Sequence, residues 1–160
     1  MFGNFCTVKY SLLQIKSGDD QAGMWVGLRY RSKDGELHSL YIVAGEETTA
    51  KPVGRSLVPI YFEHDDQSQS CYEGADRISI TASSVTLTLN KNGRHSLELP
   101  RTVEFATAKA SRDYRKAKTM FTEMSKRHGG DVIQVAEPGG STRTPRSRPV
   151  SNRGSLARRR

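Results

Sequence analysis

The chain has 160 residues, a formal net charge of +8 and an apolar content of 35%, which suits one compact domain with an appended segment and argues against two domains. Nearly all large apolar side chains lie within residues 1–136, whereas residues 137–160 hold seven arginines against Glu137, a net charge of +6. The basic character therefore belongs mainly to the tail, and it gives no argument that the folded part binds nucleic acid.

The N-terminal segment begins with a weakly alternating stretch at residues 2–15, which predicts one or two strands followed by a turn at residues 17–20. It contains no apolar run of signal-peptide length, and no window of the sequence approaches the roughly 20 apolar residues that span a bilayer. We therefore expect a cytoplasmic protein that does not enter a membrane. Cys6 and Cys71 belong to no metal-binding spacing, so both are expected to be reduced thiols.

The next segments predict a hairpin and a further strand. Residues 25–30 and 39–43 are rich in aromatic and β-branched side chains, and Asp34-Gly35 between them supplies the positive φ of a tight turn. Residues 45–56 are polar and interrupted by Pro52 and Gly54, which predicts a loop before a strand at residues 58–64.

Three further strands are predicted at residues 77–81, 84–90 and 95–99, as an antiparallel meander with Asn92-Gly93 in its second turn. In the middle strand Val85, Leu87 and Leu89 alternate with polar residues, so one face of the sheet is expected to be buried. A one-sided sheet of this kind needs a covering element.

That cover is predicted to be a single helix that begins between residues 107 and 111 and ends near His128. Its apolar stripe, at steps of three and four, consists of Tyr114, Ala117, Phe121 and Met124, and Gly129-Gly130 ends it. The predicted fold is α+β: a mainly antiparallel sheet of hairpins and a meander, covered by one C-terminal amphipathic helix. Residues 1–136 would form one domain, and residues 137–160 a disordered arginine-rich tail.

A dense polar cluster, predicted to lie on a loop between two strands, raises the question of catalysis. It comprises Glu63, His64, Asp65, Asp66, Glu73 and Asp76. In an extended chain Glu63 and Asp65 share one face while His64 points to the other, and the sequence lacks the oxygen-ligand pattern of a calcium loop. We therefore expect no metal, no cofactor and no enzyme activity. A small metal-dependent hydrolase that uses Glu63, His64 and Asp66 is the remaining catalytic alternative.

Binding is the better use of this segment, because it offers many hydrogen-bonding groups and an aromatic anchor on a loop held by strands. The predicted partner-binding residues are Glu63, Asp65, Asp66, Gln67, Ser70 and Tyr72. The alternative for each residue is a local role, in which the polar groups satisfy nearby backbone atoms and Tyr72 packs on the domain.

Residues 61–89 resemble the Imm10 family of immunity proteins, found in bacterial polymorphic toxin systems. The matching positions are Tyr61, Glu63, Asp65, Asp66, Gln67, Ser70, Tyr72 and Gly74, followed by two amphipathic strands. The resemblance implies a protein that binds and neutralises a cognate toxin domain without chemistry of its own. Its loop carboxylates would then face basic residues of the toxin, which favours fast and specific association.

The tail suggests a different class of function. Its arginines, without interleaved aromatic residues, would attract phosphates in a salt-dependent and sequence-independent way. The residues expected to do so are Arg143, Arg146, Arg148, Arg158, Arg159 and Arg160. The alternative is therefore a protein that binds nucleic acid or an anionic surface through its tail, and a third reading is a tail that only aids solubility.

Overall fold

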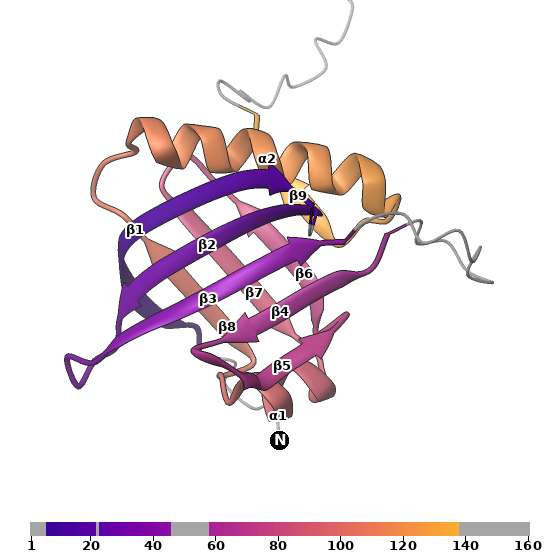
Figure 1. The fold of residues 1–160 in the computed structure, drawn as a ribbon. Helices are drawn as coiled ribbons and strands as arrows, with labels where there is room; N and C mark the ends of the chain where they lie inside the picture. Colours follow the sequence, from indigo (N-terminus) through magenta and orange to yellow (C-terminus); the bar gives the residue numbers. More distant parts are fainter. Residues whose placement is uncertain (1–5, 22, 46–57, 138–160) are drawn as a thin grey trace, which may run out of the picture.

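The computed structural model describes residues 6–21, 23–45 and 58–137, which form one nine-stranded sheet and two helices (Figure 1). The strands are β1 (Val8–Asp20), β2 (Gly23–Arg31), β3 (Leu37–Ala44), β4 (Ile60–His64), β5 (Asp66–Tyr72), β6 (Ala75–Ile80), β7 (Ser84–Leu89), β8 (Thr102–Ala106) and β9 (Ile133–Val135). The helices are α1 (Lys91–Leu97) and α2 (Arg112–His128). The predicted α+β class is confirmed.

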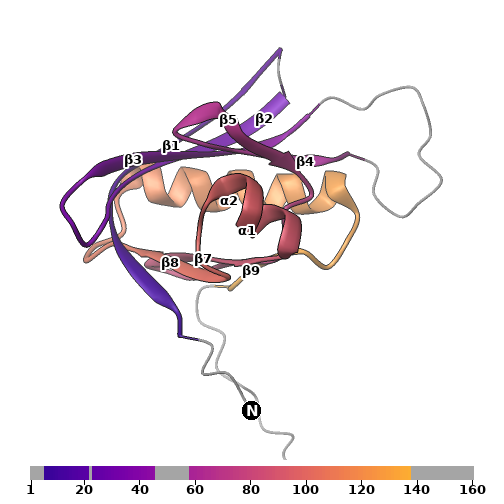
Figure 2. The ribbon, with the colours of Figure 1, turned by 90° about the horizontal axis from the view of Figure 1, so that it is seen from below.

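The strands follow the order β5-β4-β3-β2-β1-β8-β7-β6-β9 across the sheet. Neighbours are antiparallel except for the β1–β8 and β6–β9 pairs, which are parallel. The sheet bends so strongly that β1–β5 and β6–β9 form two layers that face each other, with both helices between them (Figure 2). Helix α2 contacts β1, β2, β3 and β9, and α1 contacts β4, β5 and β7, so each helix joins the two layers.

The core fills the space between the two layers and the helices. Its largest fully buried side chains include Tyr30, Phe62, Phe105 and Phe121. Strand β7 alternates as predicted, with Val85, Leu87 and Leu89 buried and the threonines between them only partly covered. The opposite faces of both layers point away from the helices (Figure 2).

The long C-terminal helix is confirmed. Its predicted stripe of Tyr114, Ala117, Phe121 and Met124 is buried. The Ser111 side chain accepts a hydrogen bond from the backbone N–H of Tyr114, which caps the start of α2, and Gly129 ends the helix at a φ of 68°. Together with Gly129 N–H donating to the carbonyl of Ser125, these contacts explain why the helix boundaries could be read from sequence.

The predicted hairpin of β2 and β3 is also confirmed, with Gly35 at a φ of 88° in its turn. The turn predicted at residues 17–20 is wrong, because these residues continue β1 and pair with β2 as far as Gly23. A bulge between Leu12 and Gln14 in β1 interrupts the alternation of buried side chains, which hid the length of this strand from the sequence pattern.

The strand predicted at residues 95–99 is wrong, and so is the prediction of a single helix, because this part of the chain forms α1. The Asn90 side chain accepts from the backbone N–H of Gly93 at 2.9 Å and caps the helix. Asn92-Gly93 therefore belongs to a helix start and not to a hairpin turn. Gly93 lies against the backbone of Gly74, where a β-carbon would stand 2.0 Å from the Gly74 carbonyl oxygen.

This close approach predicts that Gly93→Ala destabilises the protein by about 2 kcal/mol, since overpacking against backbone atoms has no flexible neighbour to absorb it. Gly45→Ala is the matched control, because a β-carbon there meets no atom within 4 Å. Urea denaturation of both variants measures the difference. Equal free energies of unfolding would show that α1 does not require a glycine at this position.

The polar segment predicted as a loop is instead the edge strand β5, so that prediction is wrong. Tyr72 pairs with Tyr61 and Ser70 with Glu63, while Asp65 makes the tight turn between β4 and β5 at a φ of 61°. Aspartate tolerates this left-handed conformation better than most residues. An edge strand with an exposed outer face needs few apolar side chains, which is why its composition resembled that of a loop.

Three predictions fall at least partly outside the described residues. They are the start of the first predicted strand at residues 2–5, the loop at residues 45–56, of which only residue 45 is described, and the arginine-rich tail beyond Glu137. Among the helices of the described ranges, none has the length and apolar character needed to cross a membrane.

Candidate functional site

Four aromatic side chains lie on the outer face of β2–β5, the face turned away from the helices. They are Trp25, Tyr41, Tyr61 and Tyr72, and together we call them the aromatic face. The strand register brings them together: Trp25 pairs with Val43, Val43 with Tyr61, and Tyr61 with Tyr72. Ring centroids are 6.3 Å apart for Trp25 and Tyr41 and 5.1 Å apart for Tyr61 and Tyr72.

Two glycines, Gly27 and Gly18, leave room for the rings of Tyr41 and Trp25 to pack flat on the sheet. A β-carbon at Gly27 would stand 2.8 Å from the ring of Tyr41, and one at Gly18 would stand 2.8 Å from the ring of Trp25. The indole N–H of Trp25 also donates to Asp20 at 3.0 Å. The sequence thus holds two of the four rings flat against the neighbouring strand, and a rigid aromatic surface loses little conformational entropy when a partner binds.

The aromatic face is open and hollowed. Tyr72 is 63% exposed and Tyr41 45% exposed. A hollow of about 320 Å³ lies between Trp25, Tyr41, Val43, Tyr61 and Glu63. The carboxylate of Glu63 accepts from the Tyr61 hydroxyl at 3.0 Å, and Lys16 and Arg29 line the neighbouring hollow towards β1. Exposed aromatic side chains bordered by charged groups are typical of protein-binding surfaces.

The predicted partner-binding residues occupy two places. Glu63, Ser70 and Tyr72 lie on or beside the aromatic face, as their strand positions require. Asp65 and Asp66 lie at the turn, and exposed Gln67 follows them on the edge strand. Part of their hydrogen-bonding capacity is used locally: Asp66 accepts from the backbone N–H of Ser68 at 2.7 Å, and the hydroxyl of Ser70 donates to the carbonyl of Gln67 at 2.8 Å.

Sequence reasoning missed Trp25 and Tyr41 as surface residues, and did not place Tyr61 in the predicted site. A signal was present. Trp25 alternates with the buried residues of β2, and Tyr41 with those of β3, so each belongs to the face opposite the core. What the alternation could not reveal is that the register of four strands brings the exposed aromatic residues side by side.

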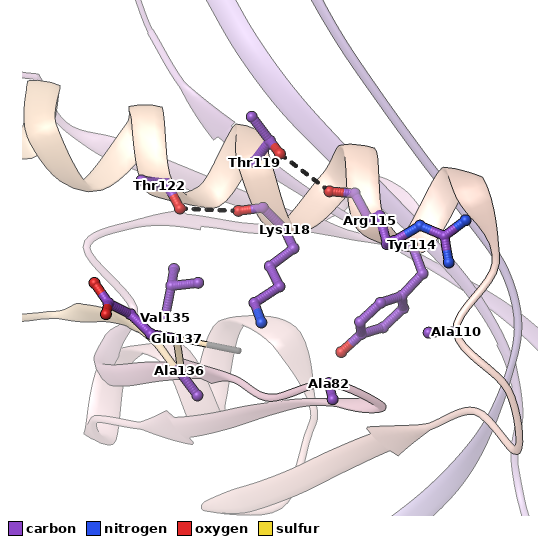
Figure 3. A pocket seen from close by; sticks show the side chains of 10 residues that line it. All are labelled: Ala82, Ala110, Tyr114, Arg115, Lys118, Thr119, Thr122, Val135, Ala136 and Glu137. Atoms are coloured by element: carbon purple, nitrogen blue, oxygen red, sulfur yellow. Dashed lines mark hydrogen bonds between the residues drawn. The ribbon is translucent and has the colours of Figure 1, made fainter. Parts of the chain in front are cut away.

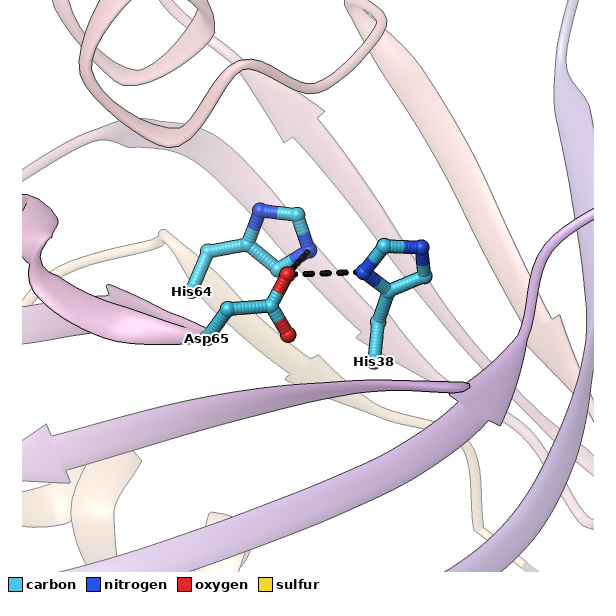
Figure 4. A group of neighbouring side chains, drawn as sticks. All are labelled: His38, His64 and Asp65. Carbon is cyan, nitrogen blue, oxygen red and sulfur yellow. Dashed lines mark hydrogen bonds and ion pairs between the residues drawn. The ribbon is translucent and has the colours of Figure 1, made fainter. Parts of the chain in front are cut away.

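Three further side chains converge where β3 begins and β4 ends: His38, His64 and Asp65. We call these three the histidine cluster (Figure 4). Asp65 Oδ2 lies 2.7 Å from His38 Nδ1 and 3.7 Å from His64 Nε2, while Asp65 Oδ1 accepts from the Ser39 N–H at 2.9 Å. Burial alone would raise the pKa of the Asp65 carboxyl, but the hydrogen bonds from His38 and Ser39 outweigh it and hold the pKa below its ordinary value.

His64 itself is buried and has a partner on each ring nitrogen. Nδ1 lies 2.7 Å from the carbonyl oxygen of Leu97 in α1, and Nε2 lies 2.6 Å from the hydroxyl of Tyr30. A carbonyl can only accept, so Nδ1 carries a hydrogen, and in the neutral imidazole Nε2 is then the acceptor for the Tyr30 hydroxyl. Burial, reinforced by Tyr10 and Asp65, raises the pKa of Tyr30 well above its ordinary value, so its hydroxyl remains a donor.

This geometry does not assemble the predicted hydrolase set. Glu63 points to the outer face of β4 while His64 is buried on the inner face. Asp66, the third member of the set, is exposed and accepts from the backbone N–H of Ser68 at 2.7 Å. Glu73, which belongs to the wider polar cluster, accepts from the Ile60 N–H at 3.0 Å. His38, which sequence reasoning did not consider, replaces them as the neighbour of His64 and Asp65. No local spacing could indicate it, because it lies 26 residues before His64 in the chain.

A larger hollow of about 490 Å³ lies beside α2 (Figure 3). Tyr114, Lys118 and Thr122 of α2 line one side, and Ala82, Val135 and Glu137 lie opposite. The hydroxyl of Tyr114 donates to the carbonyl of Thr81 at 2.9 Å, and burial raises its pKa to about 12. The lining combines small apolar side chains, such as Ala82, Ala110 and Val135, with the charged side chains of Arg115, Lys118 and Glu137.

Comparison of the chain with protein-family models, with curated proteins and with solved structures finds no match.

Proposed function

We propose that the chain is a cytoplasmic immunity protein that binds a cognate bacterial toxin domain through the aromatic face and its polar border. The single observation that carries the proposal is that rings from four neighbouring strands form one exposed surface on the outside of the sheet. Tyrosine and tryptophan dominate binding energies at protein interfaces, and a monomer gains nothing from exposing them.

The resemblance to Imm10 supports the same surface. Of its matching positions, Tyr61, Glu63, Ser70 and Tyr72 lie together on the outer side of the β4–β5 hairpin. The resembling segment and the aromatic face therefore overlap at the β4–β5 hairpin, where they share Tyr61 and Tyr72. Gly74, another matching position, is instead the point where α1 packs against the hairpin, which assigns it a structural role.

The mechanism that we propose is steric and electrostatic, without covalent chemistry. Tyr41 and Tyr72 would insert as anchors into the toxin surface, and Glu63 with Asp66 would meet basic groups of the toxin at the border. Among the described residues β5 is the edge strand of the sheet, so its outer backbone edge could take up an extended segment of the partner. Charged border groups mainly accelerate association, whereas the desolvated rings slow dissociation.

Protection of cells that express the cognate toxin domain tests the proposal. The partner to try is the toxin domain encoded beside this chain. We expect the wild-type chain to restore growth and the combined variant Tyr41→Ser, Tyr61→Ser, Tyr72→Ser to fail, with folding checked by circular dichroism. Leu13→Ser is the control, since Leu13 is 50% exposed but lies outside the aromatic face. A folded triple variant that protects fully would overturn the proposal.

Removing residues 138–160 separates this function from the alternative based on the tail. We expect the truncated chain to protect as well as the full chain, because none of the residues of the aromatic face is lost. Binding to duplex DNA in low salt, measured by fluorescence anisotropy, should weaken strongly on the same truncation, since its arginines are gone. Loss of protection together with loss of DNA binding would favour the tail as the functional part.

A further inference from the structure

We propose that the histidine cluster binds a divalent transition-metal ion, with Zn²⁺ as the representative ion, through His38 Nδ1, His64 Nε2 and Asp65 Oδ2. These three atoms all lie within 4.8 Å of one another and come from β3, from the end of β4 and from the turn after it (Figure 4). Ligands around a tetrahedral zinc ion stand about 2.0–2.2 Å from the metal, which places them about 3.3 Å from each other. Small movements of side chains would suffice.

Two of the three proposed ligands, His64 and Asp65, are already held in place by hydrogen bonds to neighbouring residues. The contact of His64 Nδ1 with the Leu97 carbonyl at 2.7 Å fixes the ring, and its Nε2, which now contacts the Tyr30 hydroxyl, lies 3.7 Å from Asp65 Oδ2. Asp65 Oδ1 accepts from the Ser39 N–H, which leaves Oδ2 between the two imidazoles. In metal-binding histidines the N–H of the second ring nitrogen commonly donates a hydrogen bond to a carbonyl in this manner. Carboxylates that bind the metal are themselves hydrogen-bonded.

His38 would provide the third ligand, and its side chain is the one that would move to reach the metal. Its side chain is 22% exposed, against 7% for His64, so it can adjust. Its Nδ1 now donates to Asp65, and the metal would replace that hydrogen, which passes to solvent or to Nε2 of the same ring. Glu36 Oε2 lies 3.8 Å from Nε2 and would accept from it. Each of the three ligands thus has an outer partner on a different residue.

Tyr30 adds a fourth polar group. Its hydroxyl lies 2.6 Å from His64 Nε2, and it would have to move away from that nitrogen when the metal binds there.

Two imidazoles and one carboxylate suit zinc and neighbouring transition metals better than calcium or magnesium, which prefer oxygen ligands. The site lies inside the hairpin whose outer side carries part of the aromatic face, but the metal proposal does not depend on the proposed function.

Calorimetric titration of Zn²⁺ into the full chain without an affinity tag tests the proposal. Cys6→Ser serves as the background, because it removes the exposed thiol. We expect one equivalent to bind per chain, and His38→Gln and Asp65→Asn to weaken binding at least about a hundredfold, beyond the 10- to 100-fold typical of losing an outer partner. Glu36→Gln, which removes only such a partner, is expected to weaken it about tenfold.

His95→Gln is the matched control, since it removes an exposed imidazole outside the cluster and should leave affinity unchanged. Thermal unfolding gives a second readout: Zn²⁺ should raise Tm for the background and for His95→Gln but not for Asp65→Asn. Asparagine keeps the shape of Asp65 and tolerates its positive φ, so this variant should fold. An absence of binding by the background chain, or equal affinity in His38→Gln, would overturn the site.

Discussion

His64→Leu is expected to lower the free energy of unfolding by about 2–4 kcal/mol, the largest stability effect that the structure predicts for a single polar side chain. Leucine fills a similar volume, so little of the loss comes from a cavity. The loss comes from two buried groups left without their partner, the Tyr30 hydroxyl and the Leu97 carbonyl, each costing about 1–3 kcal/mol. Urea denaturation followed by circular dichroism measures it.

A double-mutant cycle separates this cause from general disruption of the core. Tyr30→Phe removes the hydroxyl that His64→Leu would strand, so the double variant should be more stable than the sum of the two single losses implies, by about 1 kcal/mol or more. Strictly additive losses would mean that the 2.6 Å contact between Tyr30 and His64 contributes no coupling. Both measurements should be made in the presence of a chelator, so that bound metal does not contribute.

The second large effect concerns affinity. Tyr41→Ala and Tyr72→Ala are each expected to raise the Kd for the toxin domain about 30-fold, which corresponds to about 2 kcal/mol for loss of an interface anchor. These two residues are the most exposed of the aromatic face. Most of the change should appear in the dissociation rate, because truncating an anchor affects the formed contact more than the encounter. Surface plasmon resonance with the purified toxin domain measures both rates.

Gly27→Ala provides a sharper version of the same test, because it removes no side chain. The new methyl group would stand 2.8 Å from the Tyr41 ring and push it off the strand. We expect Kd to rise about tenfold, by loss of the preorganised ring position. Leu13→Ser, on an exposed residue elsewhere, should leave Kd unchanged. An unaltered Kd in Gly27→Ala would show that the ring position is unimportant for binding.

The parts of the fold that could be predicted from sequence are those with local causes. Helix α2 has a buried stripe, a serine cap and a glycine end within one stretch, and the β2–β3 hairpin has alternating strands around Asp34-Gly35. The parallel pairs β1–β8 and β6–β9 join segments far apart in sequence, and nothing local announces them. Asn92-Gly93 in helix α1 has the sequence of a hairpin turn and therefore predicted a turn and a strand. In the structure Gly93 instead allows close packing of α1 against Gly74.

The candidate site divides in the same way. Glu63, Ser70 and Tyr72 could be predicted as members of the site because they lie within one short polar segment. Tyr41 and Trp25 join them only through strand register, which depends on the pairing of β2, β3 and β4. The histidine cluster is harder still to predict from sequence, since His38 precedes the other two residues by 26 or more positions and the bend at Asp65 places all three together.

Hydroxyl-radical footprinting of the chain, alone and mixed with the proposed toxin partner, shows whether the aromatic face is the binding surface, because it reports the solvent exposure of individual aromatic side chains. We expect the oxidation rates of Tyr41 and Tyr72, which are 45% and 63% exposed in the free chain, to fall sharply on binding. The rate at Leu13, outside the aromatic face, should not change. Tyr41 and Tyr72 reacting as fast in the complex as in the free chain would contradict this expectation.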